Sequence, residues 1–278
     1  MRIGKLFYWL LVIFLTATML ISGSMVLEYI VDAMQQKKEY DQLASVVEQV
    51  RTEVAVQPYT EITIPPTVSP DIPEQAQSEL PTETPVPSIL PEYAAAYEEN
   101  PDLVGWMIIE GTPINYPVMQ TPDRVDYYLY RNFAKQSNSH GCLYVRESCD
   151  VFAPSDNLTI YGHHMKDGSM FTGLDKYRKE KFWEEYPTIQ FDTLYTRQTY
   201  TVFAVFKTTA SVGEGFSYHL FEDAEDEEEF YKFVSTCKSL SFYDTGITPV
   251  LGDKMITLST CEYSQDNGRL VVVAVRDK

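Results

Sequence analysis

The sequence predicts a mainly β protein: a closed, mostly antiparallel barrel of eight strands with added helices, preceded by an apolar helix and an extended linker. Three features of the 278-residue chain support this fold class. An uncharged, mostly apolar run lies near the N-terminus, and a proline-rich segment follows it. The remainder contains short runs rich in Val, Ile, Thr, Tyr and Phe, as strands do.

The first 28 residues have the features of a membrane anchor with a short cytoplasmic tip. The 22 residues between Lys5 and Glu28 are uncharged. As a helix they would span roughly 33 Å, enough to cross a hydrocarbon core of about 30 Å. Because Arg2 and Lys5 precede the run, the positive-inside bias places the N-terminus in the cytoplasm and the rest outside. A cleaved signal peptide, ending near Ser22-Gly23-Ser24, is the alternative, and both interpretations export the chain.

Residues 29–56 continue as a predicted helical stalk, because Ile30, Val31 and Met34 share one helical stripe. The pattern does not decide whether the stalk stands alone or associates with another copy. Segment 57–91 contains nine prolines, which disfavour both regular structure and a packed core. We expect a semi-rigid linker there, reaching on the order of 100 Å at about 3.1 Å per residue and holding the globular part away from the bilayer.

Residues 92–278 form the predicted globular domain. Helices are expected at 92–99, at 174–185 and at 224–240, the last opening on acidic residues that suit a helix N-terminus. Short strands with mostly non-helical connections favour a barrel. The strand-like runs are 103–109, 112–117, 142–146, 157–161, 188–192, 198–207, 254–260 and 270–276.

Charge and cysteine usage narrow the function classes. A formal charge of −18 argues against a nucleic-acid partner, because phosphate binding needs a basic face. Cysteine and histidine spacings do not resemble a zinc site. Cys142 and Cys149 are near enough in sequence to pair, although spacing does not establish geometry. Cys237 falls on the apolar face of the helix at 224–240 and is expected in the core, with Phe230, Phe233, Val234 and Leu240.

Cys261 is the candidate nucleophile. It ends one apolar strand, and Arg269 opens the next, so neighbouring strands would bring the two together. A guanidinium there can donate to an oxyanion forming on an attacked carbonyl. A thiol nucleophile also needs a base, and His163 follows the run at 157–161 at another strand exit.

These residues resemble the sortase family. Cys261 and Arg269 match its TLxTC…R signature, in Thr257-Leu258-Ser259-Thr260-Cys261 followed by Arg269. The segment around His163, Tyr161-Gly162-His163-His164-Met165-Lys166-Asp167-Gly168-Ser169-Met170-Phe171, is similar to the histidine segment of class B. Two further segments are similar to the opening strands of class B: Asn100-Pro101-Asp102-Leu103-Val104-Gly105-Trp106 and Ile114-Asn115-Tyr116-Pro117-Val118. The resemblance covers roughly residues 92–278.

The resemblance implies a sortase-type eight-stranded barrel and a two-step transpeptidation that needs no metal or organic cofactor. Cys261 would attack a C-terminal sorting motif of secreted proteins, His163 would transfer protons, and Arg269 would stabilise the oxyanion. Substrate contacts would come from Tyr161, Ser259, Thr260 and Glu262, while His164 would be a bystander.

The implied acyl acceptor is a peptidoglycan-precursor amine, for wall anchoring, or a pilin lysine. The implied setting is the membrane of a monoderm bacterium, crossed once by the chain, with the catalytic domain outside the cell. Hydrolysis in place of transfer would make the same enzyme a thiol protease.

Two alternatives compete with this interpretation. Ser139-His140-Gly141-Cys142 resembles the nucleophile motif of L,D-transpeptidases, which cross-link peptidoglycan, with Cys142 as the nucleophile. That family carries a further upstream histidine. It also carries an Arg or Asn two residues after the cysteine, a position that Tyr144 occupies here. Cys142 also stands where a sortase would have a small residue. The second alternative is a non-catalytic surface or pilus-associated module on the same barrel.

Overall fold

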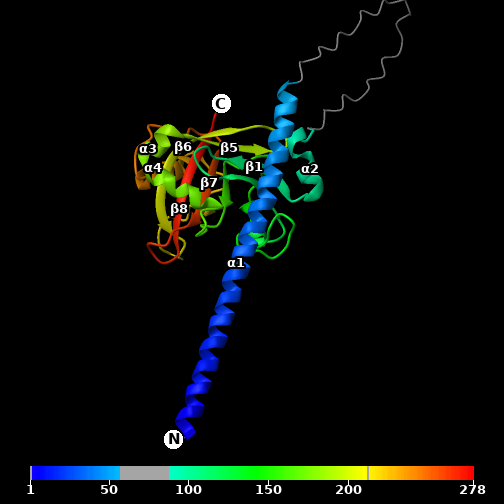
Figure 1. Ribbon diagram of the computed structural model, residues 1–278. Coiled ribbons are helices and arrows are strands. Elements are labelled where there is room, and N and C mark those ends of the chain that lie inside the picture. The colour runs from blue at the N-terminus through cyan, green and yellow to red at the C-terminus, as the bar shows by residue number, and fades with distance from the viewer. Residues whose placement is uncertain (1, 57–87, 212) are drawn as a thin grey trace, which may run out of the picture.

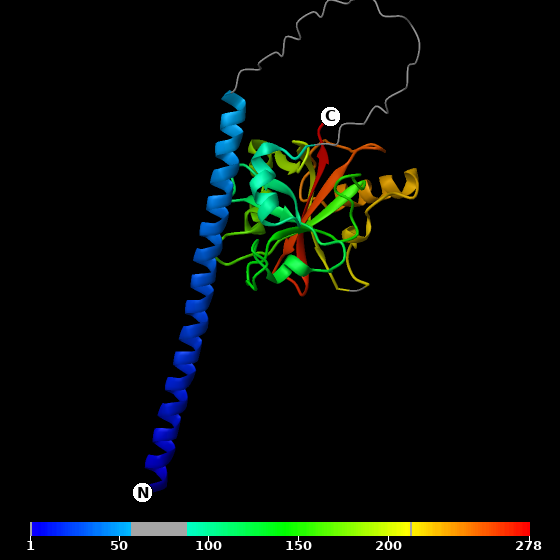
Figure 2. The same cartoon turned by 90° about the vertical axis from the view of Figure 1, so that its right-hand side faces the viewer.

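The computed structural model describes residues 2–56, 88–211 and 213–278, and most of the predicted linker lies outside these ranges. In the described part, a barrel is flanked on one side by a long N-terminal helix (Figures 1 and 2). The helix extends well beyond the barrel toward its N-terminus, so the chain has a globular head and a protruding apolar rod.

The barrel contains the eight strands that the sequence predicts, with ends shifted by up to three residues. Its order is β1-β2-β3-β4-β7-β8-β6-β5, and β5 pairs with β1 to close it. Strand pairing is antiparallel except for the pairs β2 with β3 and β4 with β7. The strands are β1 (Leu103–Ile108), β2 (Asn115–Met119), β3 (Leu143–Val145), β4 (Asn157–Tyr161), β5 (Thr188–Thr193), β6 (Thr199–Thr209), β7 (Met255–Cys261) and β8 (Gly268–Arg276).

Strand β8 shows how the core is divided. It is buried on both faces, and alternate side chains join two different clusters because successive strand residues point to opposite faces. Leu270, Val272 and Ala274 join the barrel cluster. Val271, Val273 and Val275 pack with Phe230, Phe233 and Cys237 of α4.

The helices partly match the predictions. They are α1 (Arg2–Val56), α2 (Pro91–Glu99), η1 (Tyr127–Tyr130), η2 (Phe171–Arg178), α3 (Glu180–Glu185), η3 (Tyr218–Leu220) and α4 (Glu227–Leu240). At the start of α4 the Asp226 carboxylate caps the helix by accepting from the Glu229 amide at 2.9 Å. The predicted apolar face of α4 is buried except for Leu240, which is exposed at its end.

The single helix expected at 174–185 is wrong. A 3₁₀ segment, η2, is separated from the short α3 by Lys179, whose backbone is extended. Phe171, Leu174 and Tyr177 are all fully buried. Their spacing of three fits a 3₁₀ turn, which brings residues i and i+3 onto one line, better than the 3.6-residue turn of an α-helix.

The second half of α1 packs along the barrel, which the sequence pattern did not predict. Tyr40 and Val47 are buried in the barrel's core cluster. The Gln36 side-chain amide donates to the Gly141 carbonyl at 2.6 Å, and the Tyr40 hydroxyl donates to the same oxygen at 3.2 Å. Arg51 forms an ion pair with Asp192 at 2.6 Å. The stalk is therefore part of the head's packing, and the head lies beside α1.

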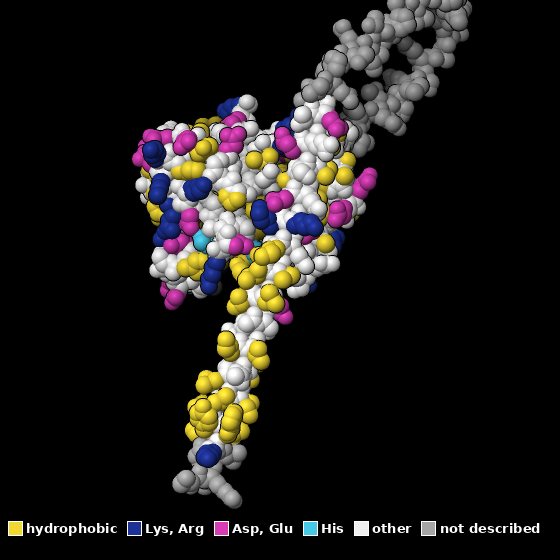
Figure 3. Space-filling view, in the orientation of Figure 1, with side chains coloured by type: hydrophobic (Ala, Val, Ile, Leu, Met, Phe, Trp, Pro, Cys, Tyr) yellow, Lys and Arg dark blue, Asp and Glu magenta, His cyan; other side chains and the backbone are white. Residues whose placement is uncertain are grey.

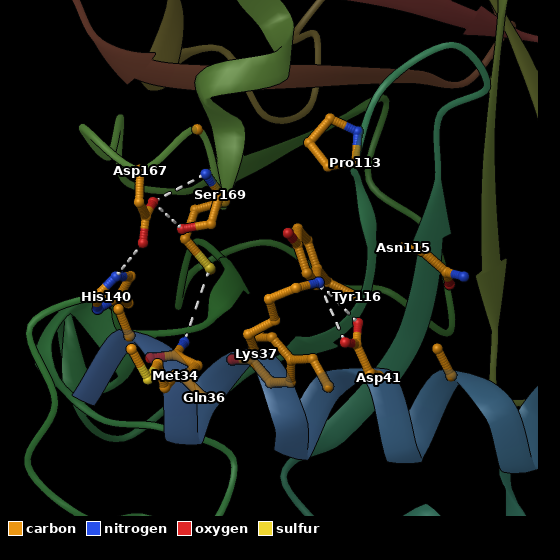
Figure 4. Close-up of a pocket in the computed structure, with 15 residues that line it drawn as sticks. Met34, Gln36, Lys37, Asp41, Pro113, Asn115, Tyr116, His140, Asp167 and Ser169 are labelled. Carbon is orange, nitrogen blue, oxygen red and sulfur yellow. Dashed lines mark hydrogen bonds and ion pairs between the residues drawn. The ribbon is translucent and has the colours of Figure 1, made fainter. Parts of the chain in front are cut away.

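Between α1 and the barrel a cleft of about 450 Å³ remains (Figure 4). Lys37 and Asp41 pair across one helical turn on its α1 side. The barrel side carries His140, whose Nε2 lies 2.9 Å from Asp167 Oδ2. The charges around the cleft are thus paired locally.

The first half of α1 is apolar and exposed (Figure 3). Its most apolar 18-residue window has a mean hydropathy of 2.3, and none of that window is buried. By length and composition α1 is compatible with membrane anchoring.

Candidate active site

A groove of about 380 Å³ lies where β4 and β7 end and β8 begins, and it contains His163, Cys261 and Arg269. Cys261 is the last residue of β7 and stands directly opposite Arg269 on β8. Strand β4 runs parallel to β7 with Tyr161 opposite Ser259, so His163 leaves the barrel at the same edge as Cys261. The strand register therefore brings together three residues that are up to 106 positions apart in sequence.

The His163 ring is held at the rim of the groove. Its Nε2 lies 2.7 Å from the Leu129 carbonyl oxygen, and the ring packs at a tilt against Tyr130 with centroids 5.4 Å apart. Because a carbonyl only accepts, Nε2 carries the proton, and a neutral ring then has Nδ1 as its base. Burial lowers the pKa of His163, and the nearby His140 lowers it further, so the neutral form is favoured.

The other groove residues present a thiol and a cation. Cys261 is half-buried at the groove, whereas the other three cysteines are buried. The Arg269 guanidinium donates through one nitrogen to the carbonyl oxygens of Gly268, at 2.9 Å, and Asn267, at 3.2 Å. A guanidinium is a cation with several donors, and this one can exchange the two carbonyl oxygens for a stronger acceptor. The groove thus combines a nucleophile, a base and an anion-stabilising donor.

Comparison with known proteins decides the family. The sortase domain family model matches residues 107–277. Sortase B of Staphylococcus aureus is 31% identical over 188 residues, which cover 67% of this chain and 75% of that protein. Sortase B of Listeria monocytogenes is 33% identical over 175 residues, covering 62% and 69%. The chain belongs to the sortase family, class B.

Solved structures agree with this assignment. A Staphylococcus aureus sortase B–substrate complex aligns with a TM-score of 0.71 at 25% identity, covering 89% of this chain and 98% of that one. Sortase B of Bacillus anthracis in complex with AAEK1 aligns with a TM-score of 0.59 at 35% identity, covering 68% and 86%. The predicted sortase-type barrel is confirmed, and the chain is a cysteine transpeptidase.

Three of the four residues expected to contact substrate line the groove of this sortase: Tyr161, Ser259 and Thr260. The Ser259 and Tyr218 hydroxyls lie 2.6 Å apart at its base. Glu262 is placed differently. Its side chain is buried against Lys207 and Arg178 and lies outside the set of described residues that line the groove.

Sequence reasoning missed several groove residues. Tyr144, Tyr218 and His219 come from β3 and η3, and Asp126 accepts from the Tyr144 hydroxyl at 2.7 Å. Burial lowers the pKa of His219, and the cations Arg146 and Arg269 lower it further. These residues carry no local sequence signal, because only the barrel's closure brings them to the groove.

Cys142 is unsuited to act as a nucleophile. It is 1% exposed, and the Tyr40 hydroxyl from α1 lies 3.1 Å from its sulfur. Burial raises its pKa far above the ordinary value. All four cysteines are free thiols, so Cys142 and Cys149 are not bridged. The L,D-transpeptidase alternative therefore lacks an accessible thiolate, and family membership in an enzyme class disfavours the non-catalytic module.

Proposed function

We propose that this enzyme cleaves a C-terminal sorting motif of secreted proteins and transfers the acyl part to an amine of a peptidoglycan precursor or a pilin. The observation that carries the proposal is the convergence of Cys261, His163 and Arg269 on one groove. The solved structures similar to this chain include a sortase B–substrate complex. By the same proposal Tyr161, Ser259 and Thr260 contact the bound motif.

The first half-reaction uses all three side chains. His163 accepts the thiol proton, and the Cys261 thiolate attacks the scissile carbonyl carbon. The carbonyl oxygen becomes an oxyanion, which Arg269 stabilises after turning from the Gly268 carbonyl. As the carbon–nitrogen bond breaks, His163 returns its proton to the leaving amine, and a thioester remains on Cys261.

The second half-reaction reverses the roles. The incoming amine attacks the thioester carbon while His163 removes its proton, and the bond between that carbon and the Cys261 sulfur breaks, leaving Cys261 as a thiolate with the electron pair. The lowered pKa of His163 suits this cycle, because a ring that is neutral at pH 7 can act as a base. Water in place of the amine gives hydrolysis.

We further propose a division of the chain into a cytoplasmic tip and anchor (1–28), a stalk (29–56), a linker (57–91) and a catalytic domain (92–278) outside the cell. The exposed apolar half of α1 and the positive residues before it support a single crossing with the N-terminus inside. The packing of α1 on the barrel would keep the groove at a fixed height above the bilayer.

Substitution of the proposed residues tests the function. Full-length protein in detergent would be assayed with a panel of sorting-motif peptides and an added amine. His163→Ala and Arg269→Ala should each reduce turnover at least about a hundredfold while leaving the melting temperature unchanged. Arg276→Ala, at the other end of the same strand as Arg269, is the matched control and should retain activity. Wild-type turnover in either groove variant would refute the assigned roles.

A further inference from the structure

Glu262 directly follows the proposed nucleophile, yet its carboxylate is buried against a cluster of partly exposed charged side chains. Its Oε1 lies 2.9 Å from Lys207 Nζ of β6 and 3.2 Å from an Arg178 nitrogen of η2. Its Oε2 accepts from the Ser264 amide at 3.0 Å and the Ser264 hydroxyl at 2.7 Å. One carboxylate therefore joins the β7–β8 turn to two other elements.

The cluster continues to the neighbour of the proposed base. Arg178 also pairs with Asp175 at 3.4 Å, and Asp175 Oδ2 lies 2.6 Å from His164 Nε2. A second link is direct: the Tyr263 hydroxyl donates to the His164 carbonyl at 3.2 Å, and the two rings meet edge-on. His164 and Glu262, each adjacent to a groove residue, are thus connected through Arg178 and Asp175, and a second time through Tyr263, the neighbour of Glu262.

The charge of Glu262 holds its carboxylate firmly against its partners. Burial would raise the pKa of Glu262, but the bonds from Lys207, Ser264 and Arg178 hold it at about 2. The carboxylate is therefore charged at any working pH. A buried charge with several charge-assisted bonds resists displacement, because leaving its partners would strand it without solvation.

We propose that Glu262, Arg178, Lys207 and Asp175 form a positioning network that fixes the spacing between His163 and Cys261. The network acts through His164 and through the β7–β8 turn, and none of its members contacts substrate. His164 is then a structural partner rather than a bystander. The inference rests on the proposed roles of His163 and Cys261.

The first test measures Cys261 reactivity without any substrate. Full-length protein in detergent is alkylated with iodoacetamide over a range of pH, and the modified residue is identified by peptide mapping. In the proposed mechanism His163 accepts the proton of this thiol, so the alkylation profile depends on the spacing between the two side chains. Glu262→Gln keeps the shape of the side chain but loosens the network. We therefore expect the inflection, which is the pH at which the alkylation rate of Cys261 reaches half its maximum, to move up by about 1 pH unit. Alkylation at pH 7 should then slow about tenfold.

The direction of the shift separates positioning from simple electrostatics. Removing a negative charge beside Cys261, with Lys207 and Arg178 still present, would by itself lower the inflection. The other titratable or charged groups of the groove include His163, His219, Asp126 and Arg269, and they are unchanged in the variant. A downward shift or no shift would overturn the proposal.

The matched control is Glu92→Gln. Glu92 is also a buried carboxylate bonded to arginine, with Arg197 at 2.6 Å, but it lies on α2 outside the groove. We expect it to lower stability without moving the inflection. An equal shift in both variants would mean that general loosening of the fold is responsible, and would overturn the proposal.

A second variant keeps the proposal testable if Glu262→Gln does not fold. Asp175 is partly exposed, so Asp175→Asn should fold and raise the inflection by a smaller amount in the same direction. If the network is continuous, the double variant will shift the inflection by less than the sum of the single shifts. Fully additive shifts, or no shift for Asp175→Asn, would contradict it.

Failure of the proposed function gives a different result. If wild-type Cys261 forms no thioester with any sorting-motif peptide, the transpeptidase roles fail regardless of the alkylation profile. If the thioester forms but Glu262→Gln alkylates like the wild type, only the positioning network fails.

Discussion

Replacing Arg51 by Met should release the C-terminal part of α1 from the barrel. The Arg51 guanidinium forms an ion pair with Asp192, hydrogen-bonds to Tyr93 and lies 3.6 Å from a Glu92 oxygen. Both carboxylate side chains are fully buried. Met retains much of the aliphatic stem and removes the guanidinium with its charge and hydrogen bonds, so the substitution isolates the polar contribution to docking.

The expected magnitude follows from the partners that remain. Removing one member of a buried ion pair costs about 3–5 kcal/mol when the other is left alone. Asp192 keeps the Tyr93 hydroxyl at 2.7 Å and the Gln190 amide at 2.8 Å, and Glu92 keeps Arg197. We therefore expect Arg51→Met to lower the free energy needed to undock α1 by about 2–3 kcal/mol, at or below the lower end of that range. The equilibrium constant for undocking should then rise roughly 30- to 150-fold.

Hydrogen–deuterium exchange of full-length protein in detergent would measure this opening. Amides of residues 36–51 should exchange faster by the stated factor, while strands β7 and β8 keep their protection. Lys37→Met on the same helix removes an exposed pair with Asp41 and should change exchange less than about twofold. Equal exchange in Arg51→Met and wild type would refute the docked position of α1.

Three further predictions concern the groove and its surroundings. Gly162→Ala would place a Cβ 2.5 Å from Leu143 Cδ2 and 2.7 Å from the Phe171 ring. We therefore expect the free energy of unfolding to fall by about 2 kcal/mol and the melting temperature by about 4–8 °C. An unchanged melting temperature would contradict this packing. Iodoacetamide at pH 7 should label Cys261 alone, because the other three cysteines are buried; comparable labelling of any of them, seen by peptide mapping, would be inconsistent with the structure. The pKa of Glu262 lies at about 2 instead of its ordinary 4.5, so the stability that this carboxylate contributes is complete above pH 4.5 and is lost as the pH falls toward 2. The melting temperature of Glu262→Gln should therefore fall less steeply than that of the wild type as the pH is lowered from 4.5 to 2. An equally steep fall would argue against the ion cluster.

The sequence predicted the barrel well because its signal is local. Runs of Val, Ile, Thr and aromatic residues identify a strand without knowledge of its neighbours, and all eight were found. The meeting of Cys261 and Arg269 was also predictable, since both lie at the ends of consecutive strands. The place of His163 beside Cys261 depends on β4 running parallel to β7, which the sequence did not predict. The motif resemblance supplied only the role of His163.

The docking of α1 could not be predicted from hydrophobic periodicity. Its contacting residues, Gln36, Tyr40, Val47 and Arg51, lie on one helical stripe, but two of the four are polar or charged. Gln36, Tyr40 and Arg51 are held by hydrogen bonds and an ion pair with residues roughly 40 to 140 positions away. The same limit applies to Glu262, whose partners Lys207 and Arg178 come from β6 and η2.

The central claim is that Cys261 carries the acyl group, and intact mass spectrometry tests it most directly. Full-length protein in detergent is incubated with a panel of sorting-motif peptides, quenched in acid and mapped. The account predicts a thioester adduct on Cys261 that an added amine discharges, and no adduct in Cys261→Ala. An adduct on Cys142, or a Cys261→Ala variant that still cleaves the peptides, would contradict it.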